Sequence, residues 1–485
     1  MKFNTNTIFF ILIIILISKS EEAQLRWAFE IFRHGARSPY DGMTSDFKDC
    51  FGQQWNGKKE LTGVGMLQHF LVGTRNRIKY INDTQLLSPI YNPKEIYLIS
   101  TDSNRTIMSA NAQVQGLYPP GTGPKLSKNQ SENAVPPIKM EEINKEKQDL
   151  DDMNFTALPY EINIIPVHSF FNADHFIQLQ DKKVCPTTLE YYKKNQQRKE
   201  IVDFLDKMTE KYGDKLNELL IIKDKSRDVL KDYAKAYYIF DTIICRYTEG
   251  YEIPKLNENV SDMELLNDAF KFFDYDLVGN GINRDKEICL YSMSPIFDRI
   301  LKWIDLKIEK DMKGDFNYTG NDLPRFVMFS AHDSTCAAFM GFMFQVFGIE
   351  NRYPYFATNI NLELYLDNST TEIKKENYII EYIINDESMI NFTYTNFTDT
   401  LKKGIKTIDE VYKFCGYIKD DNTEKDKDKD KESDNENLYL GLSIGLGFVA
   451  LVLIIVIILK IRRKKFNNKE LEHMDEVEPF SPSDN

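Results

Sequence analysis

The sequence predicts a mixed α/β domain that is interrupted by an inserted α-helical cap and followed by one C-terminal transmembrane helix. Three observations lead to this prediction. Bulky apolar runs in the first and last thirds of the chain have the length of strands, whereas the middle third has helical periodicity and many charges. An uncharged apolar run lies near the end of the 485-residue chain. Because 42% of the residues are hydrophobic, a core of ordinary size is easily built.

Three apolar runs are predicted to be buried strands of one sheet: "LRWAFEIF" at 25–32, "EIYLIS" at 95–100 and "RFVMFS" at 325–330. Each run is rich in bulky side chains and is followed by a polar loop, as buried strands often are. Two further runs, at 359–366 and 378–384, are alternating and closely connected along the chain. We expect them to be antiparallel strands at the edge of the sheet.

The segment between the two groups of strands, about 131–319, is predicted to be the helical cap. Stretches at 185–216 and 227–250 combine helical periodicity with many exposed charges. The α/β core would then consist of about 22–130 and 320–418, with the cap inserted between its two parts.

The N-terminal segment, 1–20, is predicted to be a secretory signal peptide, so the folded domain would run from 21 to 418. It begins with Lys2, continues through an apolar run, and contains the small residues Ser18 and Ser20 at the spacing that a signal peptidase accepts. The alternative is an uncleaved anchor helix, which the short apolar run disfavours.

The apolar run at 438–459 carries no charge and would span about 33 Å as a helix, enough to cross a bilayer. "KIRRKK" follows at once and marks the cytoplasmic side, so 460–485 would be an inner tail. The charged, low-complexity segment 419–437 would be a solvated stalk. The expected topology is a single-pass type I membrane protein whose main domain is extracellular or lumenal, at the cell surface or in a vacuole or lysosome.

Sequons and cysteines agree with an exported glycoprotein. All six cysteines precede the apolar run at 438–459, on the side where disulfides form, and their spacing matches no zinc site. The overall acidity, with a net charge of -13, is diffuse and argues against nucleic-acid binding. The N-x-S/T triplets lie at Asn82, Asn104, Asn129, Asn154, Asn259, Asn317, Asn368, Asn391 and Asn396.

The loops after the first three strands contain the motifs "RHGARSP", "TDSNRTIMSA" and "AHDST". Ligands of open α/β sheets bind beyond the carboxyl ends of the strands, so these loops are expected to form one site. Three arginines and two histidines would then face a single carboxylate, an arrangement suited to a compact polyanion such as phosphate. The residues are Arg33, His34 and Arg37 in the first loop, Arg105 in the second, and His332 and Asp333 in the third.

A histidine in the middle of an anion site suggests chemistry as well as binding. The neutral imidazole of His34 could attack phosphorus in line, while the arginines stabilise the equatorial oxygens. Asp333 is the only acid in these motifs placed to protonate the departing alkoxide and then to activate water. Cationic neighbours should lower the pKa of both groups, and bound phosphate should reverse this, which predicts an acidic pH optimum.

The motifs resemble those of the histidine acid phosphatases, the branch of the histidine phosphatase superfamily that includes lysosomal and prostatic acid phosphatases and phytases. "RHGARSP", "LTGVGMLQH", "STDSNRTIMSA" and "SAHD" match the family signatures in the right order, and the resemblance covers about 22–418. It implies a phosphoglycerate mutase-like mixed sheet with flanking helices and an α cap. It also implies a phosphohistidine at His34, proton donation by Asp333, phosphate contacts from the other four residues, and no metal or cofactor. Homodimers occur in the family.

The resemblance further implies a disulfide between Cys185 and Cys415. A pairing of Cys245 with Cys289 is a guess, and Cys50 and Cys336 have no assigned partner. Many animal members carry Asp where this chain has Ala36, which leaves substrate preference open.

Two alternatives to a membrane-anchored phosphomonoesterase remain at this point. One is a phosphotransfer enzyme of the same superfamily, a mutase, which the signal peptide and the span disfavour. The other is a non-catalytic surface binding protein that keeps the fold, which the complete set of catalytic residues disfavours. The remaining histidines at 69, 168 and 175 are expected to be structural.

Overall fold

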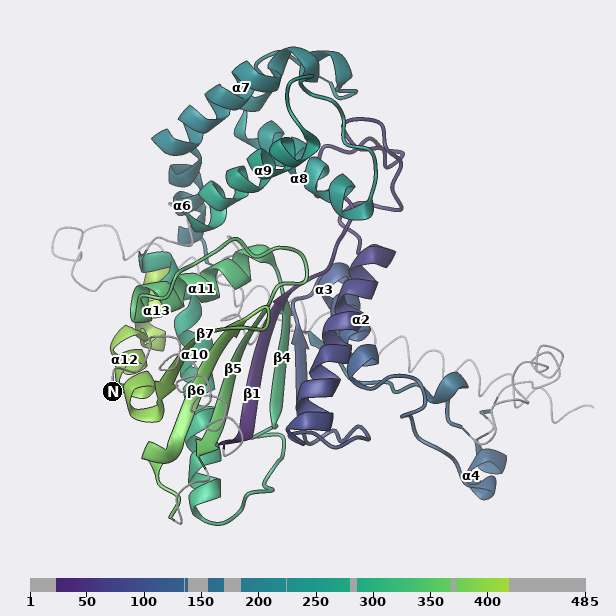
Figure 1. The fold of residues 1–485 in the computed structure, drawn as a ribbon, viewed down its shortest axis with the longest axis vertical. Helices are drawn as coiled ribbons and strands as arrows, with labels where there is room; N and C mark the ends of the chain where they lie inside the picture. Colours follow the sequence, from purple (N-terminus) through teal and green to yellow (C-terminus); the bar gives the residue numbers. More distant parts are fainter. Residues whose placement is uncertain are drawn as a thin grey trace, which may run out of the picture. The chain divides into compact units, whose positions relative to one another are not determined.

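The centre of the protein is a seven-stranded mixed sheet with the strand order β3-β2-β4-β1-β5-β6-β7 (Figure 1). The computed structural model describes residues 23–134, 136–137, 156–169, 185–223, 225–279, 286–367 and 372–417. The strands are β1 (Ala23–Arg33), β2 (Ile96–Ser100), β3 (His168–Ser169), β4 (Phe326–Ala331), β5 (Asn359–Asp367), β6 (Tyr378–Ile384) and β7 (Glu387–Thr393).

The helices divide between the sheet and the cap. Those that flank the sheet include α2 (Gly63–Arg77), α3 (Asn104–Leu117), α10 (Lys286–Met312), α11 (Asp333–Phe347), α12 (Tyr394–Gly404) and α13 (Ile408–Phe414), while α4 (Lys128–Asn133) is a short helix after α3. The cap contains α6 (Thr187–Gln196), α7 (Lys199–Leu219), α8 (Tyr233–Glu249), α9 (Asp262–Phe273) and the π-helical turn η7 (Asp274–Val278).

The predicted core strands are confirmed as parallel neighbours, because β4 lies between β1 and β2. The two later strands are antiparallel, as predicted, but their placement at the edge is wrong. β5 lies between β1 and β6, and β6 pairs with β7 on its other side. The edge strand β7 was missed because it is mostly exposed and polar, although Asn385 and Asp386 form the positive-φ turn of a tight hairpin.

Strand β1 is buried on both faces, which makes the sheet the middle of three layers. Trp27, Phe29 and Ile31 pack with residues of α10 and α11. Ala28 and Phe32 point to the opposite face and pack with residues of α3. Because side chains alternate along a strand, this pattern places helices on both sides of the central strand.

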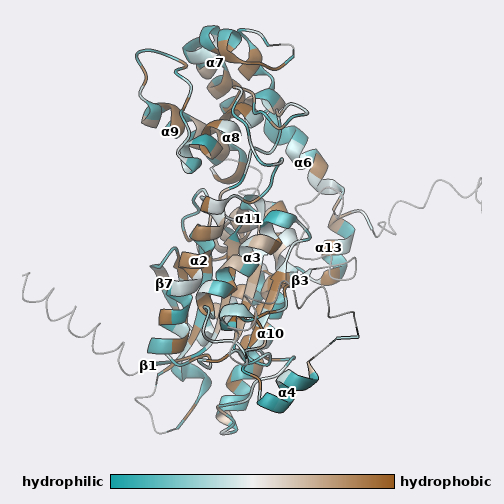
Figure 2. Cartoon of the chain, turned by 90° about the vertical axis from the view of Figure 1, so that its right-hand side faces the viewer, coloured by the Kyte–Doolittle hydropathy of each residue, from teal (hydrophilic) through white to brown (hydrophobic). Residues whose placement is uncertain are grey.

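The predicted helices at 185–216 and 227–250 are confirmed as α6, α7 and α8. Helices α7, α8 and α9 share a second hydrophobic cluster, and Figure 2 shows both hydrophilic and hydrophobic residues along α7 and α8. Cys50, from the loop after β1, belongs to this cluster. Its backbone carbonyl accepts a hydrogen bond from the backbone N–H of Ile221. Helix α10, which also lies within the segment 131–319, packs on the sheet instead.

The disulfide between Cys185 and Cys415 is present and joins the start of the cap to α13. The guessed pairing of Cys245 with Cys289 is wrong, because Cys245 lies on the cap helix α8 beside Arg37 whereas Cys289 lies on α10.

Four predicted segments fall outside the described residues: the signal peptide 1–20, the stalk 419–437, the span 438–459 and the tail 460–485. Within the part of the chain that the structure describes, no helix has the length and apolar character needed to cross a bilayer.

Candidate active site

The three motif loops begin side by side at the carboxyl edge of the parallel strands. Arg33, at the end of β1, pairs with Ala331 at the end of β4. The next residue, His34, donates its backbone N–H to Ala331 at 3.0 Å, and Thr101 donates in the same way to Ser330 at 3.1 Å. The sheet register therefore brings the loops together, as predicted from the strand ends.

A close approach of two glycines shapes the first loop. Gly35 packs against Gly65 in the first turn of α2, where a Cβ on Gly35 would lie 2.4 Å from the Gly65 carbonyl oxygen. Thr62 caps the same helix by accepting from the Gly65 N–H, and its own N–H donates to Ala36. The "LTGVG" motif thus lets backbone pack on backbone directly behind the loop.

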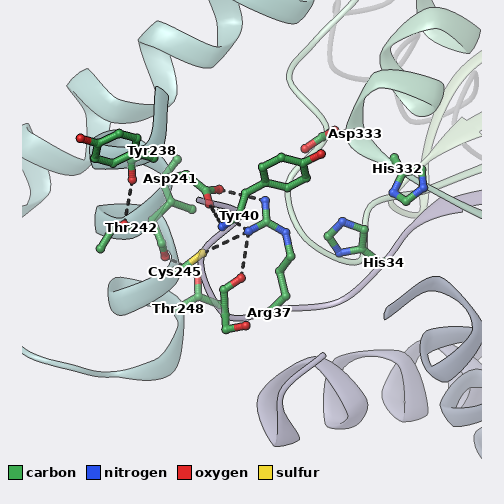
Figure 3. A network of polar contacts seen from close by, with 12 residues as sticks. His34, Arg37, Tyr40, Tyr238, Asp241, Thr242, Cys245, Thr248, His332 and Asp333 are labelled. Carbon is green, nitrogen blue, oxygen red and sulfur yellow. Dashed lines mark hydrogen bonds and ion pairs between the residues drawn. The ribbon is translucent and has the colours of Figure 1, made fainter. Parts of the chain in front are cut away.

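Five of the six predicted residues line one cleft of about 650 Å³, namely His34, Arg37, Arg105, His332 and Asp333. The sixth, Arg33, lies beside it and forms an ion pair with Asp333 at 2.8 Å. The rings of His34 and His332 have their centroids 5.7 Å apart, and Figure 3 shows them next to Arg37 and Asp333. The structure therefore brings together residues that are almost 300 positions apart.

His34 is oriented as a nucleophile would be. Its Nδ1 lies 2.9 Å from the Gly35 carbonyl oxygen, so Nδ1 carries the hydrogen and Nε2 keeps its lone pair. Burial, followed by the charges of Arg105 and Arg33, holds the pKa of His34 well below its usual value. The imidazole is therefore neutral even in mild acid.

The three arginines are only partly satisfied. Arg33 donates to the Tyr353 hydroxyl at 3.0 Å and to the Pro354 carbonyl at 2.8 Å, and its guanidinium lies 4.3 Å from the centroid of the Phe356 ring. The Nε–H groups of Arg33, Arg37 and Arg105 are buried, and none has a hydrogen-bond partner among the described residues. The guanidinium groups of Arg37 and Arg105 line the cleft and that of Arg33 lies beside it, so their combined positive charge suits the binding of an anion.

The cap supplies a residue that the sequence did not reveal. Asp241, on α8, accepts two hydrogen bonds from the Arg37 guanidinium, at 2.9 and 3.0 Å, and one from the Tyr40 backbone at 2.7 Å (Figure 3). Both charged side chains are buried. No local motif marks Asp241, because its partner lies 204 residues away.

His332 and Asp333 are the remaining predicted residues that line the cleft. Arg105 donates to His332 Nδ1 at 3.1 Å, so the ring is neutral and its Nε2–H donates to Thr101 Oγ1 at 2.9 Å. Burial alone would raise the pKa of Asp333, but the charges of Arg33 and Arg37 bring it below the usual value. Asp333 is therefore ionised when the cleft holds no substrate.

A buried hydrogen-bond network lies behind the first loop. His69 is fully buried, as expected for a structural histidine, and lies 3.0 Å from both the Arg33 carbonyl oxygen and Gln113 Oε1. Gln113 donates to Glu30 at 2.8 Å, and Asn76 donates to the same carboxylate at 2.9 Å. Burial raises the pKa of Glu30 to about 7. The network connects the backbone of the "RHGARSP" motif to Glu30, a titratable group inside the domain.

Comparisons with known proteins agree with this geometry. The family model of the histidine phosphatase superfamily (branch 2) matches residues 24–385. The chain is 27% identical over 333 residues to lysosomal acid phosphatase of Xenopus laevis, covering 68% of this chain and 64% of the frog protein. It is 25% identical over 380 residues to the human lysosomal acid phosphatase, covering 77% and 74%.

A solved structure, the phytase of Klebsiella sp. ASR1, shares the fold with a TM-score of 0.51 at 14% identity, covering 79% of this chain and 96% of that one. The chain belongs to branch 2 of the histidine phosphatase superfamily. The resemblance predicted from the motifs is thus confirmed, and both of these vertebrate relatives are lysosomal acid phosphatases. The alignment spans less than two thirds of the frog protein's length.

Proposed function

We propose that this chain is a membrane-anchored acid phosphatase that hydrolyses phosphomonoesters through a phosphohistidine on His34. The observation that carries the proposal is the convergence of one neutral, oriented imidazole with three guanidinium groups in and beside one cleft. A phosphate monoester supplies the oxygens that such donors require.

In the first step, His34 Nε2 attacks phosphorus in line with the ester oxygen. A nitrogen–phosphorus bond forms, the ester phosphorus–oxygen bond breaks, and the alkoxide takes a proton from Asp333. Arg33, Arg37 and Arg105 stabilise the charge on the equatorial oxygens. His332 contacts the phosphate as well only when its Nε2–H turns from Thr101 to a phosphate oxygen. Asp241 acts through Arg37 as a positioning residue, since it fixes the guanidinium by two hydrogen bonds.

In the second step, water attacks the phosphohistidine and passes a proton to Asp333. The nitrogen–phosphorus bond breaks, inorganic phosphate leaves, and both residues return to their starting states. Asp333 can donate a proton only if bound phosphate raises its pKa, because without substrate the arginines keep it ionised. We therefore expect kcat/KM to be highest on the acid side of neutrality, and a maximum above pH 8 would contradict the mechanism.

The test is hydrolysis of p-nitrophenyl phosphate by the purified full-length protein in detergent, with and without chelator. A brief reaction with a ³²P-labelled monoester, quenched in base, should leave label on His34, because phosphohistidine survives base. Turnover without trapped label at any pH would reject the covalent mechanism. Transfer of label to a second substrate hydroxyl, rather than to water, would favour the mutase, and binding without turnover would favour a surface receptor.

We also propose that the chain is anchored in a membrane. The segment 1–20 would direct export and 438–459 would hold the domain at a membrane, with the tail 460–485 on the cytoplasmic side. The names of the relatives favour a lumenal, lysosome-like site. Alkaline carbonate extraction of cells expressing the full chain should leave it in the membrane fraction, and truncation after 437 should release it. Release of the full chain would reject the anchor.

A further inference from the structure

The cleft contains a buried carboxylate that the proposed reaction does not use. Asp276 lies in the π-helical turn η7 of the cap and lines the same cleft as His34 and Asp333. It is only 3% exposed. Single π-helical turns occur often at functional sites, since they push one residue out of the helical register.

Among the described residues, hydrogen bonds reach only one carboxylate oxygen of Asp276. Oδ1 accepts from the Tyr233 hydroxyl and, at 2.9 Å, from Asn195 Nδ2, which also donates to the Asp276 backbone carbonyl at 3.0 Å. None of the hydrogen bonds between Asp276 and the other described residues uses Oδ2. The side chain is thus held rigidly from α6 and α8, with one oxygen left for a ligand in the cleft.

Asp276 interacts with titratable groups of the cap and of α11. Burial raises its pKa to about 6, and the nearby charge of Asp333 on α11 adds to this rise. Tyr233 and Tyr237 face it from α8, and the ammonium of Lys193 on α6 lines the same cleft. Asp276 is therefore a negative charge near neutral pH, within electrostatic reach of the position proposed for proton donation.

We propose that Asp276 selects the leaving group of the substrate. It accepts a hydrogen bond from a hydroxyl or ammonium group on the leaving group and repels a second anionic group. Near neutral pH the preferred substrate would then be a monophosphate ester of an alcohol that carries hydroxyl or amino groups, and not a polyphosphorylated compound. This inference rests on the proposed phosphomonoesterase activity, because it assumes which end of the substrate the arginines hold.

The test compares three esters of equal length: O-phosphoethanolamine, n-propyl phosphate and the phosphate ester of 3-hydroxypropanoate. Their leaving groups carry an ammonium, a methyl and a carboxylate group. At pH 7.5 we expect the ratio of kcat/KM for the ammonium ester to that for the carboxylate ester to fall by about 10- to 100-fold in Asp276→Asn. In the wild-type protein the same ratio should shrink between pH 7.5 and pH 5, whereas in Asp276→Asn it should follow only the ionisation of the phosphate.

The matched control is Tyr233→Phe, which removes a hydrogen bond to Oδ1 but keeps the charge, so the preference for the ammonium ester should persist. Equal changes for all three esters in Asp276→Asn, or a loss of preference in Tyr233→Phe as large as in Asp276→Asn, would overturn the inference. Calorimetric binding of the three esters to His34→Ala separates the two proposals, because it reports selectivity without turnover. Absence of turnover by the wild-type protein would reject the proposed function alone.

Discussion

The two sides of the cleft are built in different ways. The phosphate floor consists of the loops after β1, β2 and β4 and contains three arginines, two histidines and Asp333. The cap wall consists of α6, α8 and η7, and its lining includes three tyrosines, with Lys193 and Asp276 as its charged groups among the described residues. In the proposed reaction, the charged floor would hold the phosphate and the wall would face the rest of the substrate.

In the proposed reaction, the floor residues would carry out the chemistry and the wall residues would select the substrate. Floor residues must keep fixed positions relative to three strand ends, so each lies in a short motif. Wall residues only need to face the cleft, and they are scattered over three cap elements. Asp241 is the exception, because it belongs to the cap but contacts Arg37 of the floor. The predictions below test this division.

Removing the nucleophile of the floor should have the largest effect. In His34→Ala we expect kcat to fall by roughly 10⁴-fold or more, the scale seen when a covalent nucleophile is lost. Vanadate should still bind, because the arginines remain. Steady-state hydrolysis of p-nitrophenyl phosphate and competition by vanadate measure the two properties. Near-normal turnover would mean that the floor does not perform the reaction.

Loss of the proton donor should depend on the leaving group. In Asp333→Asn we expect kcat for an alkyl phosphate to fall by about 10²- to 10⁴-fold. The effect on p-nitrophenyl phosphate should be smaller, because p-nitrophenolate leaves without a proton. The comparison of the two substrates is the measurement, and equal losses would remove Asp333 from the role of acid.

Weakening the ion pair between Asp241 of the cap and Arg37 of the floor should reduce activity by an intermediate amount. Asp241→Asn leaves a neutral partner for Arg37, and we expect kcat/KM to fall by about 10- to 100-fold, the value of one or two hydrogen bonds between charged groups. The matched control is Asp203→Asn, an acid on α7 that pairs with Lys199 at the surface. If both variants behave alike, the cap does not position the floor.

Glu30, which lies behind the floor, should affect the stability of the protein more than its turnover. Because the pKa of Glu30 is raised to about 7 from its ordinary value near 4.5, folding binds a proton between these values, and the wild-type protein should lose stability as pH rises through that window. The loss contributed by Glu30 is up to about 3 kcal/mol. In Glu30→Gln this loss should vanish.

The free energy of unfolding of both proteins is measured in urea at pH 5 and at pH 7.5. Relative to the wild type, Glu30→Gln should be more stable at pH 7.5 than at pH 5. Parallel stability changes in both proteins would show that Glu30 does not titrate in this range.

The sequence predicted the floor well because its signals are local. Apolar runs locate β1, β2 and β4, and a polar motif follows each run directly, so the carboxyl-edge rule was enough to group His34, Arg105 and Asp333. The antiparallel strand β7 and the interior position of β5 were missed, because an exposed edge strand has no apolar pattern and strand order is not encoded in any one segment.

The sequence by itself determined the class of fold, the family and the composition of the phosphate floor, because strand periodicity and contiguous motifs act over a few residues. Only the tertiary structure decided that Asp241 holds Arg37, that Glu30 lies behind the motif, and that Asp276 faces the cleft. These contacts join residues far apart in the chain, and each depends on how the cap and the helices pack. The physical reason is that burial and pairing of charge are set by packing, which no single stretch of sequence contains.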